Sequence, residues 1–136
     1  MNNTLDQRGL PTGATLRPDE ISPRDFAAKL KNDPSSVVFI DVRTPSEWDV
    51  SHVPGSTLIP LDEIEDRHDE IDEAPLVGIL CHHGVRSLKA ALALKQLGHK
   101  NVVSIFGGIE LWSLAVDENV PRYARDRMTG RCVTIK

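Results

Sequence analysis

The amino-acid sequence predicts an α/β fold in which a mostly parallel sheet of about five strands is covered by helices on both faces. Short continuous apolar runs, typical of strands buried on both faces, occur at 36–41 (SVVFID) and 76–80 (LVGIL). Segments with helical periodicity and capping residues separate these runs. The length of 136 residues suits a single domain with one core.

The first element follows from local capping signals. Residues 1–19 are polar and contain Gly and Pro, so we expect a flexible N-terminal arm. A helix is expected over 21–33, because Ser22 suits the N-cap and Pro23 suits the first helical position. The strand at 36–41 should come next.

The remaining elements continue the alternation of strand and helix. A helix is expected over 61–71, with Leu61, Ile64 and Ile71 turned inward. The end of the chain, RCVTIK, fits either a strand or a disordered segment. The other expected elements are a loop at 42–56 that allows one helical turn at PSEW (45–48), a short strand at 57–60, a helix at 87–98, a strand at 101–106 and a helix within 107–116.

Composition excludes several classes of function. The net charge of −4 argues against nucleic-acid binding, which usually needs a basic face. No apolar run approaches the ~20 residues of a membrane span, and no secretory signal is evident, so no membrane partner is expected. Cys81 and Cys132, the two cysteines, are too few for a disulfide framework or a four-cysteine zinc site. A reduced, cytoplasmic setting is therefore expected.

Cys81 stands where a buried strand should end and a helix should begin. In parallel sheets, active sites lie beyond the carboxyl ends of the strands. A tight loop over 81–86 can turn backbone N–H groups inward as an anion-binding nest, and Gly84 permits the backbone angles that this requires. The N-terminus of the following helix adds partial positive charge. These features predict a loop that favours the thiolate over the thiol.

The side chains of this loop add donors and charge. Arg86 supplies a fixed cation with planar donors, and His82 and His83 supply donors whose charge depends on pH. Ser87 can cap the helix or donate its hydroxyl to the sulfur. No Asp or Glu occurs from 74 to 109, so no acidic residue lies near Cys81 in the sequence.

Each of these residues also has a simpler interpretation. A lone cysteine after a buried strand is more often a small hydrophobe, and paired histidines are more often surface residues. Adjacent residues point apart and no fourth ligand is evident, so no metal is expected. The order of the residues within 81–87, at a strand-to-helix junction, is what favours a reactive cysteine.

Three ordered segments identify a family. CHHGVRS (81–87) resembles the active-site loop of rhodanese-like sulfurtransferases, in which a cysteine precedes a short glycine-containing loop with Arg before Ser or Thr. DVRTPSEWDVSHVPGSTLIP (41–60) resembles the motif with Asp-Val-Arg, a Glu-aromatic pair and His-Val-Pro-Gly. FGGIELW (106–112) resembles the Gly-Gly-x-x-x-Trp segment that closes the domain. The resemblance covers roughly 20–123.

The resemblance implies a three-layer α/β/α domain over 20–123, preceded by the arm at 1–19 and followed by a tail at 124–136 to which we assign no definite structure. It implies that Cys81 is the catalytic residue, and that Asp41 and Arg43 belong to a structural ion-pair network below the site. No cofactor is expected. The substrate-binding loop would consist of His82, His83, Gly84, Val85, Arg86 and Ser87.

The resemblance also implies a reaction. Cys81 would take the outer sulfur of a small anionic donor such as thiosulfate and carry it as a persulfide to cyanide, a thiol or a protein acceptor. A persulfide carrier or a regulatory binding module without turnover is the alternative. Cys132 would then be either a resolving thiol or, more simply, an uninvolved one.

A cysteine phosphatase or arsenate reductase is the nearest enzymatic rival. Such phosphatases place five residues between the cysteine and the arginine, whereas here only 82–85 separate Cys81 from Arg86. The shorter loop makes a smaller cup, which suits one sulfur atom better than a tetrahedral phosphate. We therefore expect no useful phosphatase activity.

Overall fold

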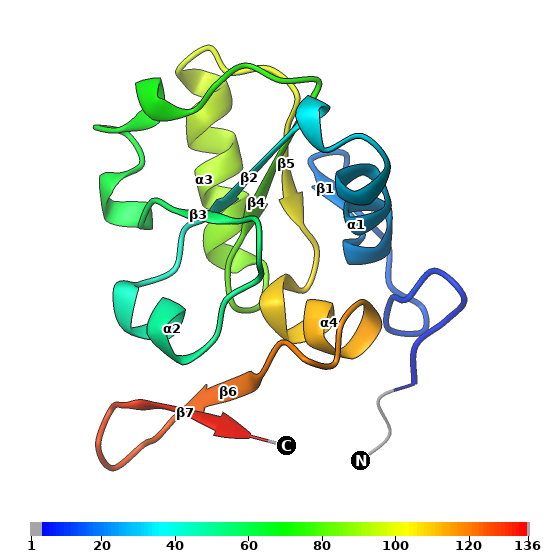
Figure 1. Ribbon diagram of the computed structural model, residues 1–136, viewed down its shortest axis with the longest axis vertical. Coiled ribbons are helices and arrows are strands. Elements are labelled where there is room, and N and C mark those ends of the chain that lie inside the picture. Colours follow the sequence, from blue (N-terminus) through cyan, green and yellow to red (C-terminus); the bar gives the residue numbers. More distant parts are fainter. Residues whose placement is uncertain (1–3, 136) are drawn as a thin grey trace.

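The protein forms a five-stranded parallel sheet with helices on both faces (Figure 1). The computed structural model describes residues 4–135. The strands lie in the order β1-β5-β4-β2-β3, and every neighbouring pair in this sheet is parallel. This architecture confirms the predicted fold class. The strands are β1 (Glu20–Ile21), β2 (Val37–Asp41), β3 (Thr57–Leu58), β4 (Leu76–Leu80) and β5 (Val102–Ile105).

Each face of the sheet has its own core because side chains alternate along the strands. Ile79 and Cys81 belong to the cluster that includes Ala90 and Leu94 of α3 (Val85–Gln96). The other cluster includes Phe26 of α1 (Pro23–Asn32) and Ile109 and Trp112 of α4 (Gly108–Ala115). The sulfur of Cys81 is therefore on the face that α3 covers.

Gly78 in the middle of β4 shows how closely α1 approaches the sheet. A Cβ atom at this position would lie 2.1 Å from the ring of Phe26. The glycine therefore allows the buried phenylalanine to pack directly on the strand that leads into Cys81.

Capping determines where the two N-proximal helices begin. The Ser22 side chain accepts a hydrogen bond of 3.1 Å from the amide of Asp25, as expected for the N-cap of α1. Thr44 and Glu47 form a capping box at the start of α2 (Pro45–Val50), which lies within the expected loop at the place where the sequence allows a helical turn over 45–48.

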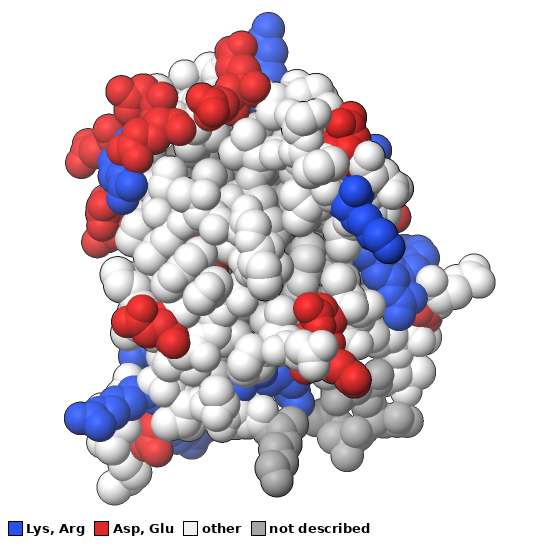
Figure 2. All heavy atoms as spheres, in the orientation of Figure 1, with Lys and Arg blue, Asp and Glu red and all other residues white. Residues whose placement is uncertain are grey.

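The predicted helix over 61–71 is wrong. Two short 3₁₀ helices, Leu61–Glu63 and His68–Glu70, stand in its place, although Ile64 and Ile71 are buried as expected. Acidic side chains at helical spacings of three and four residues would repel one another, and this disfavours a continuous α-helix. Figure 2 shows red acidic atoms gathered at the upper left, over this part of the chain.

Helix α3 also differs in detail from its prediction. It begins at Val85 rather than at 87, and its buried face consists of Ser87, Ala90, Ala91 and Leu94. The helix therefore starts within the cysteine loop, which shortens the loop to three residues after Cys81.

The first and last parts of the described chain both contain paired strands or bridges. In the N-terminal arm, Leu5 and Pro11 form an isolated bridge and Leu10 is fully buried. The C-terminal residues form an antiparallel hairpin of β6 (Arg122–Arg125) and β7 (Cys132–Ile135), so the expected boundary after residue 123 falls inside β6. Within residues 4–135, no helix has both the length and the apolar character needed to cross a membrane.

Candidate active site

The cysteine loop joins the carboxyl end of β4 to the first turn of α3. Gly84, the N-cap of α3, has a φ of 103°, in the left-handed region that glycine adopts readily. A Cβ atom at Gly84 would lie 3.2 Å from the amide nitrogen of Gly107. Glycine thus serves both the sharp turn and the close approach of the neighbouring loop.

The sulfur of Cys81 lies inside this turn. The backbone N–H of Gly84 donates to Sγ at 3.0 Å, and the hydroxyl oxygen of Ser87 lies 3.2 Å from the same atom. Cys81 is only 1 % exposed. Ser87 in turn shares a 2.7 Å hydrogen bond with the hydroxyl of Ser104 on β5. Two polar groups therefore surround a sulfur that is otherwise shielded from water.

Helix α4 fixes the backbone of the loop from the other side. The amide of Ile109 donates to the carbonyl oxygen of Cys81 at 2.8 Å, and the amide of Glu110 donates to that of His82 at 3.2 Å. Because a trans peptide holds its C=O and N–H on opposite sides, the amides of residues 82 and 83 face away from α4. A Cβ at Gly108 would meet the carbonyl oxygen of His82 at 2.3 Å, so glycine is needed there.

Arg86 does not extend toward open solvent but pairs with Glu47 of α2. Its two terminal nitrogens donate to the two carboxylate oxygens at 2.6 and 2.9 Å. Burial alone would raise the pKa of Glu47, but hydrogen bonds from Arg86 and Tyr123 outweigh burial and hold this pKa well below its usual value. The hydrogen bonds to Glu47 raise the pKa of Arg86 in turn. The predicted binding residue Arg86 therefore carries a charge that is already paired.

Asp41 and Arg43, the residues expected below the site, form a fully buried ion pair. The guanidinium contacts the carboxylate at 2.6 Å, and both side chains are fully buried. Arg43 also donates to the carbonyl oxygen of Ser51 at 2.7 Å and to the hydroxyl of Tyr123 at 3.1 Å. This arrangement ties the end of β2 to α2 and to the C-terminal hairpin.

The two histidines of the loop have different surroundings. The ring of His82 stacks on that of Tyr123 at 4.1 Å with an interplanar angle of 12°, whereas His83 is exposed. Burial, together with the neighbouring His83, lowers the pKa of His82 to about 4, so His82 is neutral at pH 7. Val85 is 66 % exposed and lies at the rim of the loop.

Several residues of the site were not singled out from the sequence for this role. Glu47 and Gly108 occurred only within quoted family motifs, and no local pattern pointed to Ser104 or Tyr123. The parallel pairing of Ile79 with Ser104 brings the serine next to the loop, and this pairing can be identified only once the strand order is known.

Cys132 and Cys81 are both free, and they contact different cores. Cys81 packs in the cluster under α3, whereas Cys132 packs at the edge of the cluster that contains Tyr123.

The fold and site define a class of protein, the α/β domains with a cysteine loop at the carboxyl end of the sheet. The family model described as "Rhodanese-like domain" matches residues 22–115, and the chain belongs to this family.

The relatives of the chain include proteins named as a sulfur carrier and as a sulfurtransferase. The chain is 38% identical over 94 residues to the "Putative sulfur carrier protein YrkF" of Bacillus subtilis, matching 69% of this chain and 50% of that protein. It is 35% identical over 92 residues to the "Thiosulfate sulfurtransferase GlpE" of Pseudoalteromonas translucida, matching 66% of this chain and 86% of that protein. The chain thus spans half or less of the length of the first curated relatives.

Solved structures agree with this assignment. A rhodanese-like domain protein from Staphylococcus aureus superposes with a TM-score of 0.63 at 31% identity, covering 69% of this chain and 90% of that one. The chain is therefore a rhodanese-like sulfurtransferase-family domain.

Proposed function

We propose that the protein moves sulfane sulfur from thiosulfate or a similar anionic donor to a thiophilic acceptor through a persulfide on Cys81. The observation that carries this proposal is the 3.0 Å contact between the Gly84 amide and the buried Cys81 sulfur. An N–H donor at this distance stabilises a negatively charged sulfur more than a neutral thiol. Similarity to a named thiosulfate sulfurtransferase supports the choice of donor.

The reaction proceeds in two displacement steps. The Cys81 thiolate attacks the outer sulfur of thiosulfate, a new S–S bond forms, and the old S–S bond breaks with its electron pair leaving on sulfite. Cyanide or a thiolate then attacks the terminal sulfur of the persulfide and restores the Cys81 thiolate. No external oxidant or reductant is needed, and ping-pong kinetics are expected because the enzyme is covalently modified between the steps.

The roles of the loop follow from its charges. The Gly84 amide and the Ser87 hydroxyl hold the sulfur anion. The amides of residues 82 and 83, which face away from α4, are the further donors that an anion-binding nest would use. His83 is the exposed donor for the incoming anion. Arg86 holds the loop in shape through its ion pair with Glu47. This pairing offsets part of the positive charge that Arg86 would otherwise present to the donor.

Intact-protein mass spectrometry tests this function. Thiosulfate should add one sulfur atom to Cys81, and cyanide should then remove it as thiocyanate. The matched control is the Cys132→Ser variant, which should behave as the wild type. The proposal would be contradicted if the wild-type protein gained no sulfur from any of several sulfane donors tried.

A persulfide carrier is the second candidate, favoured by the 38% identity to a protein named as a putative sulfur carrier. A carrier would load sulfur on Cys81 and pass it to a protein acceptor, with slow or no turnover on cyanide. Sulfur gain without thiocyanate production would therefore favour the carrier over the enzyme.

A further inference from the structure

The C-terminal hairpin contacts the cysteine loop, although the hairpin lies outside the residues that match the family model. The match ends at residue 115, whereas the hairpin comprises β6 and β7. Figure 1 shows the hairpin beneath α2 and α4, and β7 packs against α2. The hairpin is thus next to the helix that carries Glu47.

Tyr123 is the hairpin side chain that enters the core. It is only 2 % exposed. Its hydroxyl donates to the Oε2 atom of Glu47 at 2.6 Å and accepts from Arg43 at 3.1 Å. Burial raises the pKa of Tyr123, and the hydrogen bond to Glu47 raises it further, so the hydroxyl stays protonated and remains a donor.

The same side chain reaches the cysteine loop at two points. Its hydroxyl holds the Glu47 carboxylate, whose two oxygens bind Arg86 near the end of the loop. Its ring stacks on His82, the residue directly after Cys81. The Gly84 amide that contacts the sulfur lies between these two points in the chain.

The charges around Tyr123 explain why a hydroxyl is needed here. One ion pair, Asp41 with Arg43, lies on one side, and a second, Glu47 with Arg86, lies on the other. A phenol can accept from the first pair and donate to the second, which a phenylalanine ring cannot do. Removing the oxygen leaves a buried guanidinium and a buried carboxylate each short of one hydrogen bond.

We infer that Tyr123 is a positioning residue that holds the cysteine loop in its sulfur-binding shape through Glu47, Arg86 and His82. The inference rests on the proposed function for its catalytic meaning. Its structural part concerns the order of the loop and stands independently of the substrate.

The test compares Tyr123→Phe with Val133→Ala in a Cys132→Ser background. Val133 is exposed on the opposite side of the same hairpin, so its variant controls for general effects on the hairpin. Persulfide formation is measured in single turnovers with thiosulfate. Hydrogen exchange of the Gly84 amide is measured by NMR on the same proteins, which reports loop order without any substrate.

Tyr123→Phe should slow persulfide formation about five- to tenfold, less than the full free energy of a hydrogen bond to a charged group because Tyr123 acts through Glu47 and Arg86 and does not touch the sulfur. It should also speed exchange at Gly84 several-fold. Tyr123→Ala, which also loses the ring against His82, should have a larger effect. Val133→Ala should leave both readouts unchanged.

The inference is overturned if the Tyr123→Phe protein folds and its Gly84 amide exchanges at the wild-type rate, whether or not the rate of persulfide formation changes. A lowered melting temperature with unchanged rate and exchange would assign Tyr123 a purely structural role and would also overturn it. If the wild type forms no persulfide, the proposed function fails, and the exchange measurement alone decides the fate of the inference.

Discussion

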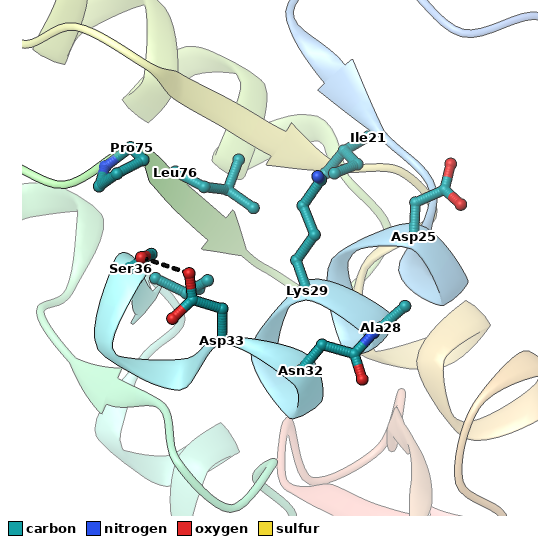
Figure 3. A pocket seen from close by; sticks show the side chains of 10 residues that line it. Ile21, Asp25, Ala28, Lys29, Asn32, Asp33, Ser36, Pro75 and Leu76 are labelled. Carbon is teal, nitrogen blue, oxygen red and sulfur yellow. Dashed lines mark hydrogen bonds between the residues drawn. The ribbon is translucent and has the colours of Figure 1, made fainter.

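The two ends of the parallel sheet hold their polar side chains in different ways. At the carboxyl end, two ion pairs and a tyrosine hydroxyl are interlocked beneath the cysteine loop. At the opposite end, a cavity of about 750 Å³ opens beside the first residues of β2 and β4. Figure 3 shows its polar side chains, with Lys29 extended across it and Asp33 hydrogen-bonded to Ser36.

The size of a cavity therefore does not identify the end of the sheet that carries the reactive cysteine. The polar groups that line the cavity include Lys29, which is exposed to water. Below the loop, Asp41, Arg43 and Glu47 are buried and ion-paired, so their charges act at set positions. The cysteine site differs from this cavity because it has fixed charges beside a buried nucleophile, and not because it has a larger volume.

Cys81→Ser should abolish sulfur transfer at the carboxyl end of the sheet. A serine hydroxyl is far less ionised than a thiol and cannot form a persulfide, so thiocyanate production should fall by at least about a thousandfold. Steady-state assay of thiocyanate checks this result. Turnover retained in the variant would place the chemistry elsewhere.

Glu47→Gln should cause the next largest loss. The change leaves Arg86 without its charged partner, and because Arg86 is partly exposed we expect a loss of about 2–3 kcal/mol in the free energy of unfolding, less than for a fully buried pair. Urea unfolding measures it. The control is Glu63→Gln in the exposed pair with Arg67, which should cost no more than about 0.5 kcal/mol. Equal effects of the two variants would contradict the comparison.

His82 should make stability depend on pH in a defined window. Its folded pKa of about 4 is below the unfolded value of 6.5, so between these values the unfolded chain binds more protons and stability falls as the pH falls. Allowing for partial exposure, about 1 kcal/mol should be lost between pH 7 and pH 5. His82→Phe, which keeps a ring against Tyr123, should lose less over the same range. An NMR titration of His82 with a midpoint near 6.5 would refute this.

Lys29→Ala at the cavity end should have the smallest effect. Truncation of an exposed side chain changes stability by no more than about 0.5 kcal/mol, and the rate of persulfide formation should stay within about twofold of the wild type. Paired unfolding and single-turnover measurements check both values. A large loss of rate would show that the two ends are coupled.

Sequence patterns predicted the elements whose signals are local. The apolar run of β4, the cap at Ser22 and the placement of Cys81 after the strand all depend on neighbouring residues. The helix over 61–71 was wrong because its apolar spacing was given more weight than repulsion among its acidic side chains. The network around Tyr123 could not be predicted, because it joins residues 76 positions apart that no periodicity relates.

The hydrogen-bonded hydroxyls of Ser87 and Ser104 imply that ionisation of the Cys81 sulfur changes the hydrogen bonding of a side chain within the sheet. While sulfur keeps its hydrogen, it donates to Ser87. Once that hydrogen leaves, Ser87 must turn its own hydrogen toward the anion, and Ser104 must then donate to Ser87 across their 2.7 Å contact. The two hydroxyl hydrogens therefore change direction together, so the charge state of the sulfur affects a side chain of the neighbouring strand β5.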